Sequence, residues 1–336
     1  MKIIIDVMSG DHAPLALIQG AAMAADAYPE VEITVVGRED VIRRLAGENG
    51  ISLDKLTIEH AESVMDMEDK PMSVIREKKD SSMSIGLELL KNGKGDAFVS
   101  AGNTGALIAG ATLLVRRLRG IQRAGIATIL PFPHPVMLLD SGANLLLTPE
   151  NQEQFAVMGA TYMEKIFGIE DARVGQLNNG TEYNKGMPLQ VESYITLSKS
   201  GVNFIGNVES KEIPFNACDV LVADGFLGNI VLKYTEGMGK FMLKTLKSLF
   251  YSNKMGMVAG LMLKKQVGVL KKQFDASEYG GAPLLGIAKP VIKAHGSSDA
   301  VAIKNAVRQA IEFVKTDVNA DIERRIAEKL AVGDHA

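Results

Sequence analysis

Short runs rich in valine and isoleucine alternate along this chain with longer stretches of helical periodicity. This alternation is typical of βαβ units, in which helices connect parallel strands and cover the faces of their sheet. The 336 residues are 46% hydrophobic and 23% charged, as expected for a globular protein. We therefore predict an α/β protein, a mostly parallel α/β/α sandwich, with residues 1–336 forming one continuous domain.

The same patterns predict the individual elements. The Pro/Gly-rich segment 277–290 is the best candidate for a functional loop or a domain seam. We expect strands at residues 3–6, 32–37, 57–60, 97–100, 125–130, 136–140, 173–177, 203–207, 220–223 and 291–294. We expect helices at residues 15–28, 39–46, 72–92, 105–115, 149–167, 186–200, 227–251 and 300–330.

Charge and cysteine content narrow the class of protein. The net charge of -3 gives no global reason to expect nucleic acid as a partner. The single cysteine, Cys218, cannot form an internal disulfide, which fits a reducing compartment. Asp6 interrupts the first apolar run too early for a secretory signal, and the longest apolar runs are too short to span a bilayer. We expect a cytoplasmic protein.

Metal and dinucleotide sites are not indicated either. The five histidines show no HxxH or HExxH spacing, and one cysteine cannot build a zinc knuckle. The first strand is not followed by G-x-G-x-x-G, the fingerprint of a dinucleotide site. The sequence therefore predicts no metal and no cofactor.

Five predicted strands end in the same way, with small residues together with Asp, Asn, Ser, Thr or His. In an open α/β sheet the ligand lies beyond the carboxyl ends of the strands. Glycines there let backbone N–H groups approach an anion, and the following helix adds its positive end. The five segments are IIIDVMSGDHAP, DAFVSAGNTGALIAG, VMLLDSGANLL, DVLVADGFLGNIVLK and VIKAHGSSDAVAIKNA.

These segments, together with GNVE and YGGAPLLG, follow one another over nearly the whole chain. In this order they resemble the bacterial phosphate acyltransferase family, the acyl-carrier-protein:phosphate transacylases of phospholipid synthesis. The chain departs from the family pattern at Ser9, where glycine is common, and at Ser141, where valine is common. The resemblance implies a Rossmann-like fold similar to phosphotransacetylases and isopropylmalate dehydrogenases.

The resemblance also implies the reaction and the partners. Inorganic phosphate would attack the thioester of a long-chain acyl carrier protein and give an acyl phosphate, without a covalent enzyme intermediate. Phosphate is itself a nucleophile, so the enzyme needs anion-binding groups and oxyanion donors rather than a Ser-His-Asp triad. Accordingly, Gly-x-Ser-x-Gly is absent and Cys218 leads into an apolar strand. The product would pass to a glycerol-3-phosphate acyltransferase at the membrane.

Within this framework we assign candidate roles to polar residues at the strand ends. Capping of the following helix is the structural alternative for Asn103, Thr104 and Asp224. His295 either binds phosphate or protonates the leaving sulfur. The catalytic candidates are Lys185 as a positive charge, Asn229 as a donor to the thioester oxygen, Asp224 as its orienter, and His295. The phosphate- or substrate-binding candidates are Asp11, His12, Gly102, Asn103, Thr104, Gly105, Asn144, Ser297 and Ser298.

Two interpretations remain open for the polar residues at the end of the first strand, and two for Lys185. His12 is expected to contact the anion, with Asp11 as its orienter. The alternative is that Asp11 caps the first helix ahead of Pro14. Lys185 is likewise either a solvated charge or the cation that faces phosphate.

Residues 237–274 form a basic segment that holds eight lysines and no acidic residue. Its apolar residues follow helical spacing on both sides of a Gly/Met-rich centre, which predicts a protruding amphipathic helical hairpin with an apolar tip. Three roles remain open: homodimerisation, docking of acyl carrier protein, and peripheral contact with the anionic inner face of the cell membrane. The residues chosen for membrane or partner contact are Lys254, Met257, Leu261, Lys264 and Lys265.

Two other functions compete with this interpretation. A nicotinamide-dependent dehydrogenase of a small hydroxy acid would share the fold class, but it needs an Asp cluster for metal and an adenosine-binding loop, and neither is evident. A non-catalytic membrane scaffold would have lost its polar strand ends, yet five persist.

Overall fold

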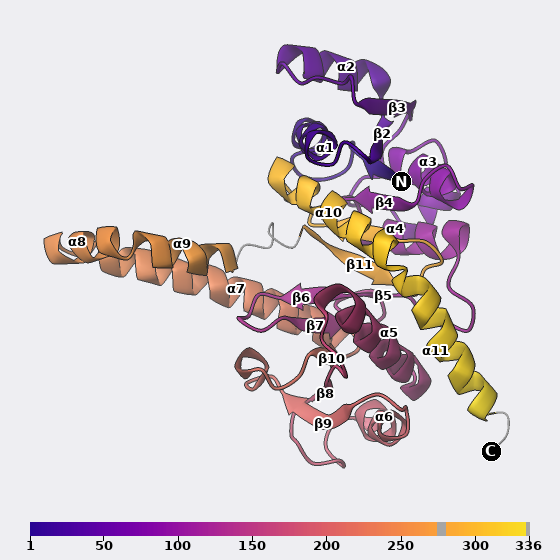
Figure 1. Cartoon of the computed structure of the whole chain (residues 1–336), viewed down its shortest axis with the longest axis vertical. Helices are drawn as coiled ribbons and strands as arrows, with labels where there is room; N and C mark the ends of the chain where they lie inside the picture. Colours follow the sequence, from indigo (N-terminus) through magenta and orange to yellow (C-terminus); the bar gives the residue numbers. More distant parts are fainter. Residues whose placement is uncertain (274–279, 334–336) are drawn as a thin grey trace.

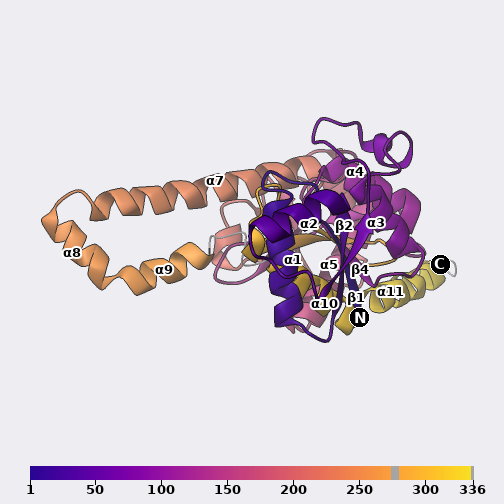
Figure 2. The ribbon, with the colours of Figure 1, turned by 90° about the horizontal axis from the view of Figure 1, so that it is seen from above.

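The structure, a computed structural model, describes residues 1–273 and 280–333. Its strands form two sheets, and a long helical arm protrudes from the body that they build (Figures 1 and 2). Both sheets are mostly parallel, with helices on their faces, so the predicted α/β class is confirmed. The strands are divided between two sheets, however, instead of lying in one.

The first sheet has seven strands in the order β3-β2-β1-β4-β12-β11-β5. The first five of these run parallel, while β11 is antiparallel to both of its neighbours. Its strands are β1 (Lys2–Asp6), β2 (Glu32–Gly37), β3 (Leu56–His60), β4 (Ala97–Ser100), β5 (Gly125–Ile126), β11 (Gly281–Leu285) and β12 (Val291–Ala294).

The second sheet has five strands in the order β6-β7-β10-β8-β9, of which only β6 is antiparallel. The predicted strand 125–130 is in fact two strands, because Ala127 separates β5 of the first sheet from β6 of the second. The strands of this sheet are β6 (Thr128–Leu130), β7 (Val136–Leu139), β8 (Val174–Asn178), β9 (Phe204–Glu209) and β10 (Val220–Val222).

Helices cover both sheets. In the first sheet α1 and α10 lie on one face and α3 and α4 on the other; in the second, α5 and α6 lie opposite the start of α7. The helices are α1 (Leu15–Ala27), α2 (Glu39–Glu48), α3 (Ser82–Lys91), α4 (Thr104–Gly110), α5 (Pro149–Phe167), α6 (Pro188–Ser198), α7 (Gly225–Phe250), α8 (Lys254–Met262), α9 (Lys264–Gln273), α10 (Ala300–Thr316) and α11 (Val318–Gly333). Short turns η1 (Pro71–Ile75), η2 (Ala111–Val115) and η3 (Ile213–Phe215) complete the set.

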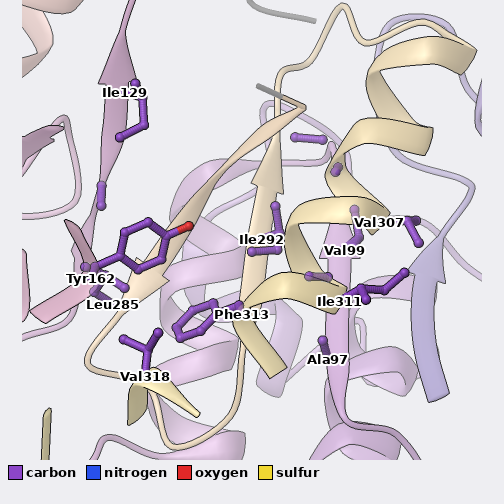
Figure 3. Packing of buried hydrophobic residues seen from close by; sticks show 14 of the residues in the cluster. Ala97, Val99, Ile129, Tyr162, Leu285, Ile292, Val307, Ile311, Phe313 and Val318 are labelled. Atoms are coloured by element: carbon purple, nitrogen blue, oxygen red, sulfur yellow. The ribbon is translucent and has the colours of Figure 1, made fainter. Parts of the chain in front are cut away.

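The largest hydrophobic cluster joins the two sheets. It contains Val99 of β4 and Ile292 of β12, together with Ile129 of β6 and Met137 of β7. Figure 3 shows Tyr162 of α5 beside Phe313 of α10 within this cluster, and their rings meet edge to face at 5.6 Å. Buried residues of both sheets therefore pack into one apolar cluster, and the single domain of residues 1–336 stays a prediction.

Three further predictions about elements were wrong in detail. The helix expected at 300–330 is broken at Asp317, whose φ of 48° ends α10 in the left-handed region. The helix expected at 72–92 is a short 3-10 turn followed, after a loop, by α3. Segment 277–290, predicted as a functional loop or a domain seam, contains strand β11 and is thus not a loop throughout; residues 277–279 lie outside the described part.

The basic segment forms an arm of three helices, since α8 and α9 both return from the far end of α7. The predicted two-helix hairpin therefore has an additional helix at its apolar tip. Position 274, its predicted end, lies outside the described residues.

Candidate active site

A cavity of about 510 Å³ lies where the carboxyl ends of β1, β4 and β12 face the start of α7 and the loop after β7. It brings together four residues from different strand ends that we had selected from the sequence. They are Asp11, Thr104, Asn229 and His295. Apolar side chains line the rest of the wall, among them Met67, Ile126, Ile129 and Leu232.

The loops after β1 and β12 are joined at the cavity. The Asp11 backbone N–H donates to the carbonyl oxygen of Gly296 at 2.8 Å. Gly10 has a φ of 129°, and a Cβ there would lie 3.1 Å from the same oxygen, so this contact needs glycine. His12 is exposed and does not line the cavity, although its neighbour Asp11 does. The cavity therefore gives no support to the predicted anion contact of His12.

His295 follows β12 directly and is fixed by its own loop. Its Nδ1 lies 2.8 Å from Ser297 Oγ and accepts the Ser297 backbone N–H at 3.2 Å. Because Nδ1 accepts, the neutral ring carries its proton on Nε2. Desolvation by burial, followed by the nearby Lys233 ammonium, holds the pKa of His295 below its usual range. The result is a neutral imidazole with an N–H donor.

Ser298 does not line the cavity. Its side chain is buried, and its hydroxyl has no hydrogen-bond partner within the described residues. Its backbone N–H donates to the His295 carbonyl oxygen and thus closes the turn before α10.

Helix α7 forms one wall of the cavity. Asn229, Lys233 and Glu236 lie on its cavity side, with Lys233 paired to Glu236 at 2.9 Å. Asp224 accepts the backbone N–H groups of Phe226 and Leu227 at 3.0 and 2.9 Å. Of the two roles considered for Asp224, the structure therefore supports the helix cap.

The loop after β7 is wound around a buried carboxylate. Asp140 accepts the N–H groups of Ile126, Gly142 and Ala143, and both the backbone and the side-chain N–H of Asn144. The Asn144 side chain also donates to the Ala124 carbonyl oxygen at 2.7 Å. Both amide hydrogens of Asn144 are thus engaged, one by Asp140 and one by Ala124 ahead of β5, in place of the phosphate contact that we expected.

Ser141, one of the two departures from the family pattern, lines the cavity. Its hydroxyl donates to the Ile126 carbonyl oxygen at 3.0 Å and lies 2.7 Å from Thr128 Oγ1. Ser141 and Thr128 thus place a pair of hydroxyl groups in the wall.

Asn103 also has a structural role. Its Nδ2 lies 2.9–3.2 Å from the carbonyl oxygens of Asp66, Met67 and Asp69, and its Oδ1 caps α4 through the Ala106 N–H. The amide therefore anchors the loop before η1 instead of being available to phosphate. Thr104, the next residue, does line the cavity.

The two glycines of this motif serve packing. A Cβ on Gly102 would lie 2.7 Å from the Ser9 Cβ, and one on Gly105 would lie 2.8 Å from Pro71. Neither glycine lines the cavity. Ser9, the other departure from the family pattern, is buried against Gly102, and its hydroxyl has no hydrogen-bond partner among the described residues.

Lys185 lies apart from these groups. It is exposed in the loop after β8, where its carbonyl oxygen accepts from Asn178 Nδ2 at 2.9 Å, and it does not line the cavity. Its role as the cation that faces phosphate stays a prediction.

Lys293, which is not among the residues predicted from the sequence, is half-buried in the cavity wall. The signal was present, because a lysine stands inside the otherwise apolar strand Val291–Ala294.

Cys218 is fully buried, and desolvation raises the pKa of its thiol to about 12. It therefore cannot supply a thiolate nucleophile near neutral pH. A search of the described residues finds no group of three or more His, Cys, Asp or Glu able to hold a metal ion.

The arm exposes the residues selected for membrane or partner contact. Lys254, Lys264 and Lys265 are exposed, and so are Met257 and Leu261, at 44% and 74% of their surface. Helix α8 has no buried residue at all. None of the described helices is long and apolar enough to cross a bilayer.

Comparison with known proteins agrees with this architecture. Solved structures with the same fold include a phosphotransacetylase from Streptococcus pyogenes, with a TM-score of 0.59 at 17% identity over 95% of this chain and 94% of that one. Another is a branched-chain phosphotransacylase from Enterococcus faecalis, with a TM-score of 0.53 at 14% identity over 93% and 99%. The predicted likeness to phosphotransacetylases is confirmed at the level of the fold.

Sequence relatives are much closer. Phosphate acyltransferases from Caldanaerobacter subterraneus subsp. tengcongensis and Thermoanaerobacter pseudethanolicus are 44% and 45% identical, each over 97% of both chains. The family model described as "Fatty acid synthesis protein" matches residues 1–321. On this evidence the chain belongs to the phosphate acyltransferase family, as its motifs predicted.

Proposed function

We propose that this phosphate acyltransferase transfers a long-chain fatty acyl group from the thioester of acyl carrier protein to inorganic phosphate, by direct attack of phosphate on the thioester carbon. The observation that carries the proposal is the composition of the cavity. The cavity of about 510 Å³ is lined by neutral His295, the Asn229 amide and the Lys293 ammonium. The thiol of Cys218 is buried elsewhere. Such a site binds and polarises substrates and leaves nucleophilic attack to phosphate.

The chemistry follows from these donors. A phosphate oxygen forms a bond to the thioester carbon, and Asn229 donates a hydrogen bond to the carbonyl oxygen as it gains negative charge. The carbon–sulfur bond then breaks and the electron pair stays on sulfur, where the Nε2–H of His295 donates a hydrogen bond to the leaving thiolate. The proton that completes the thiol comes from the hydroxyl group of the hydrogen phosphate ion, which becomes more acidic once the phosphate is acylated. The products are acyl phosphate and the free thiol of the carrier.

The direct test uses purified protein, palmitoyl-acyl carrier protein and inorganic phosphate. Loss of thioester should require phosphate, and hydroxylamine should trap the acyl phosphate as hydroxamate. Without phosphate, intact-mass analysis should find no acylated enzyme. An acylated enzyme would contradict direct attack, and loss of thioester without hydroxamate would mean hydrolysis.

Substitution of Asn229 tests the oxyanion role. Removal of one such donor typically lowers kcat by about 10²–10³, so Asn229→Ala should lose activity on this scale. Asn92→Ala is a matched control, because Asn92 is exposed at the end of α3 and outside the cavity. Lys185→Ala tests the predicted role of Lys185 as the cation that faces phosphate. Full turnover by the folded variant would show that Lys185 has no such role.

The arm is proposed to bring the enzyme to an anionic membrane and to take part in a homodimer. Support for the membrane contact comes from the exposed apolar residues Met257 and Leu261, flanked by Lys254, Lys264 and Lys265. The product, a hydrophobic acyl phosphate, would then be released near a membrane-bound glycerol-3-phosphate acyltransferase. Docking of acidic acyl carrier protein uses the same charges, and binding to the carrier in the absence of lipid would favour it.

A further inference from the structure

Lys293 occupies a central place in the first sheet. It is the penultimate residue of β12, paired in register with Ser100 of β4 and Ala282 of β11, and its side chain reaches the cavity. A lysine so enclosed has lost much of its hydration, and this desolvation lowers its pKa to about 8. The position therefore costs stability, which invites a functional explanation.

The ammonium has one donor to spare. Its Nζ donates to the carbonyl oxygens of Ala101, at 3.2 Å, and of Ala294. An ammonium carries three N–H groups, so these two acceptors leave one for a ligand. Because the two carbonyl groups hold the nitrogen in place at the cavity wall, the third N–H needs little further ordering to bind.

The charge of Lys293 is also incompletely balanced. Asp11 and Asp6 attract it from a distance, yet within the described residues neither carboxylate forms an ion pair with it. Lys233, the other lysine lining the cavity, is paired with Glu236 at 2.9 Å. Among the described residues of the wall, Lys293 is thus the cation whose charge is left for an anion from solution.

We infer that Lys293 binds the inorganic phosphate that accepts the acyl group, through its remaining N–H and its positive charge. This assignment rests on the proposed function, which places phosphate attack in this cavity. Phosphate is the doubly charged substrate, and a positioned ammonium suits it as a point charge. The alternative is that Lys293 only ties two carbonyl oxygens together.

Steady-state kinetics separate the two roles. A charge-assisted hydrogen bond to a substrate is worth enough that Lys293→Met should raise the KM for phosphate about tenfold or more, with a much smaller change in the KM for palmitoyl-acyl carrier protein. Lys293→Arg keeps the charge and should recover part of the phosphate affinity. Lys289→Met is the matched control, because this half-buried lysine also donates to a carbonyl oxygen, that of Gly95, but lies outside the cavity.

The wild-type protein provides a test that needs no substitution. Inorganic phosphate alone is titrated by calorimetry as the pH is raised through the pKa of Lys293. Above the pKa of Lys293, about 8, free phosphate is a dianion, and its affinity there should fall about tenfold per pH unit as the ammonium loses its proton. The charged and titratable groups that face Lys293 are the carboxylates of Asp6, Asp11 and Glu236, the ammonium of Lys233 and the neutral ring of His295.

The outcomes are distinct. If wild-type protein forms no phosphate-dependent hydroxamate, the proposed function fails and this inference fails with it. If wild-type protein forms hydroxamate while folded Lys293→Met keeps its KM for phosphate within twofold, only the inference is overturned. Should Lys293→Met not fold, a phosphate affinity that does not change with pH in the wild-type protein would overturn it equally.

Discussion

Asp140 offers the sharpest test of how the cavity is built. Its side chain is fully buried, and its two oxygens accept backbone N–H groups from the loop that follows β7, the N–H of Ile126 from β5 and the side chain of Asn144. Asp140→Asn preserves the size of the side chain but replaces one acceptor oxygen with an NH₂ group. In either orientation of the new amide, the N–H groups that donated to one carboxylate oxygen face its NH₂ group instead.

The cost can be worked out from these bonds. Oδ1 accepts from Ile126, Gly142 and Ala143, and Oδ2 accepts from Ala143 and twice from Asn144. At least two N–H groups lose their acceptor, and a buried unsatisfied group costs about 1–3 kcal/mol. We expect the free energy of unfolding to fall by about 2–6 kcal/mol, a large part of the ~5–15 kcal/mol typical of native proteins.

Urea denaturation followed by circular dichroism measures this change. Asp26→Asn makes the same chemical substitution at a residue whose side chain is 72% exposed and pairs with Lys55 at the surface, so a loss below about 1 kcal/mol is expected there. The activity of Asp140→Asn should fall as well, since Ser141 and Gly142 of this loop line the cavity. A variant destabilised by less than about 1 kcal/mol would refute the view that the carboxylate organises the loop.

Three further results are expected. Gly228→Ala should prevent α7 from docking and abolish activity, because the new Cβ would lie 1.9 Å from the Asp140 carbonyl oxygen; an active, normally melting variant would contradict this packing. The double variant Met257→Asp/Leu261→Asp should lose sedimentation with anionic liposomes and keep its melting temperature, as both side chains are exposed; unchanged sedimentation would exclude insertion of the tip. The pKa of His295 is lowered, so its ring stays neutral down to below pH 6.5, and protonation of Nδ1 below that pH would set its N–H against the Ser297 backbone N–H and disturb the loop; the acid limb of kcat/KM should therefore lie below pH 6.5 and disappear in His295→Gln; a limb that persists in the variant belongs to another group.

Strands could be predicted closely from the sequence because apolar runs in a parallel sheet are short and sharply bounded. β2, β4 and β12 have the bounds expected for them. β11 was missed, since its Gly281 and Pro283 resemble a loop in any local pattern. The division into two sheets depends on which strands pair across Ala127, and local periodicity carries no information on such pairing.

Site residues, like strands, could be predicted where the signal lies in a short stretch of sequence and not where it depends on distant partners. Asp11, Thr104, Asn229 and His295 line one cavity, as expected where the carboxyl ends of parallel strands converge. Asn103 and Asn144 were given binding roles because their actual acceptors, such as the Met67 and Ala124 carbonyl oxygens, are distant in the sequence. An asparagine that closes a loop and one that binds an anion look alike until those acceptors are located.

Helix α7 has a mechanical consequence of its own. It is 26 residues long, hence about 39 Å from end to end, and it carries Asn229 near its anchored end and α8 at its far end (Figure 2). Such a rod is a lever, in which each degree of tilt moves the far end by about 0.7 Å and the Asn229 amide by a small fraction of that. A contact that restrains the tip of the arm therefore restrains the position of the Asn229 amide to within a much smaller displacement. Coupling between two sites is reciprocal. If substrate binding favours one tilt of α7, it strengthens or weakens binding at the tip by the same free energy with which binding at the tip changes substrate affinity.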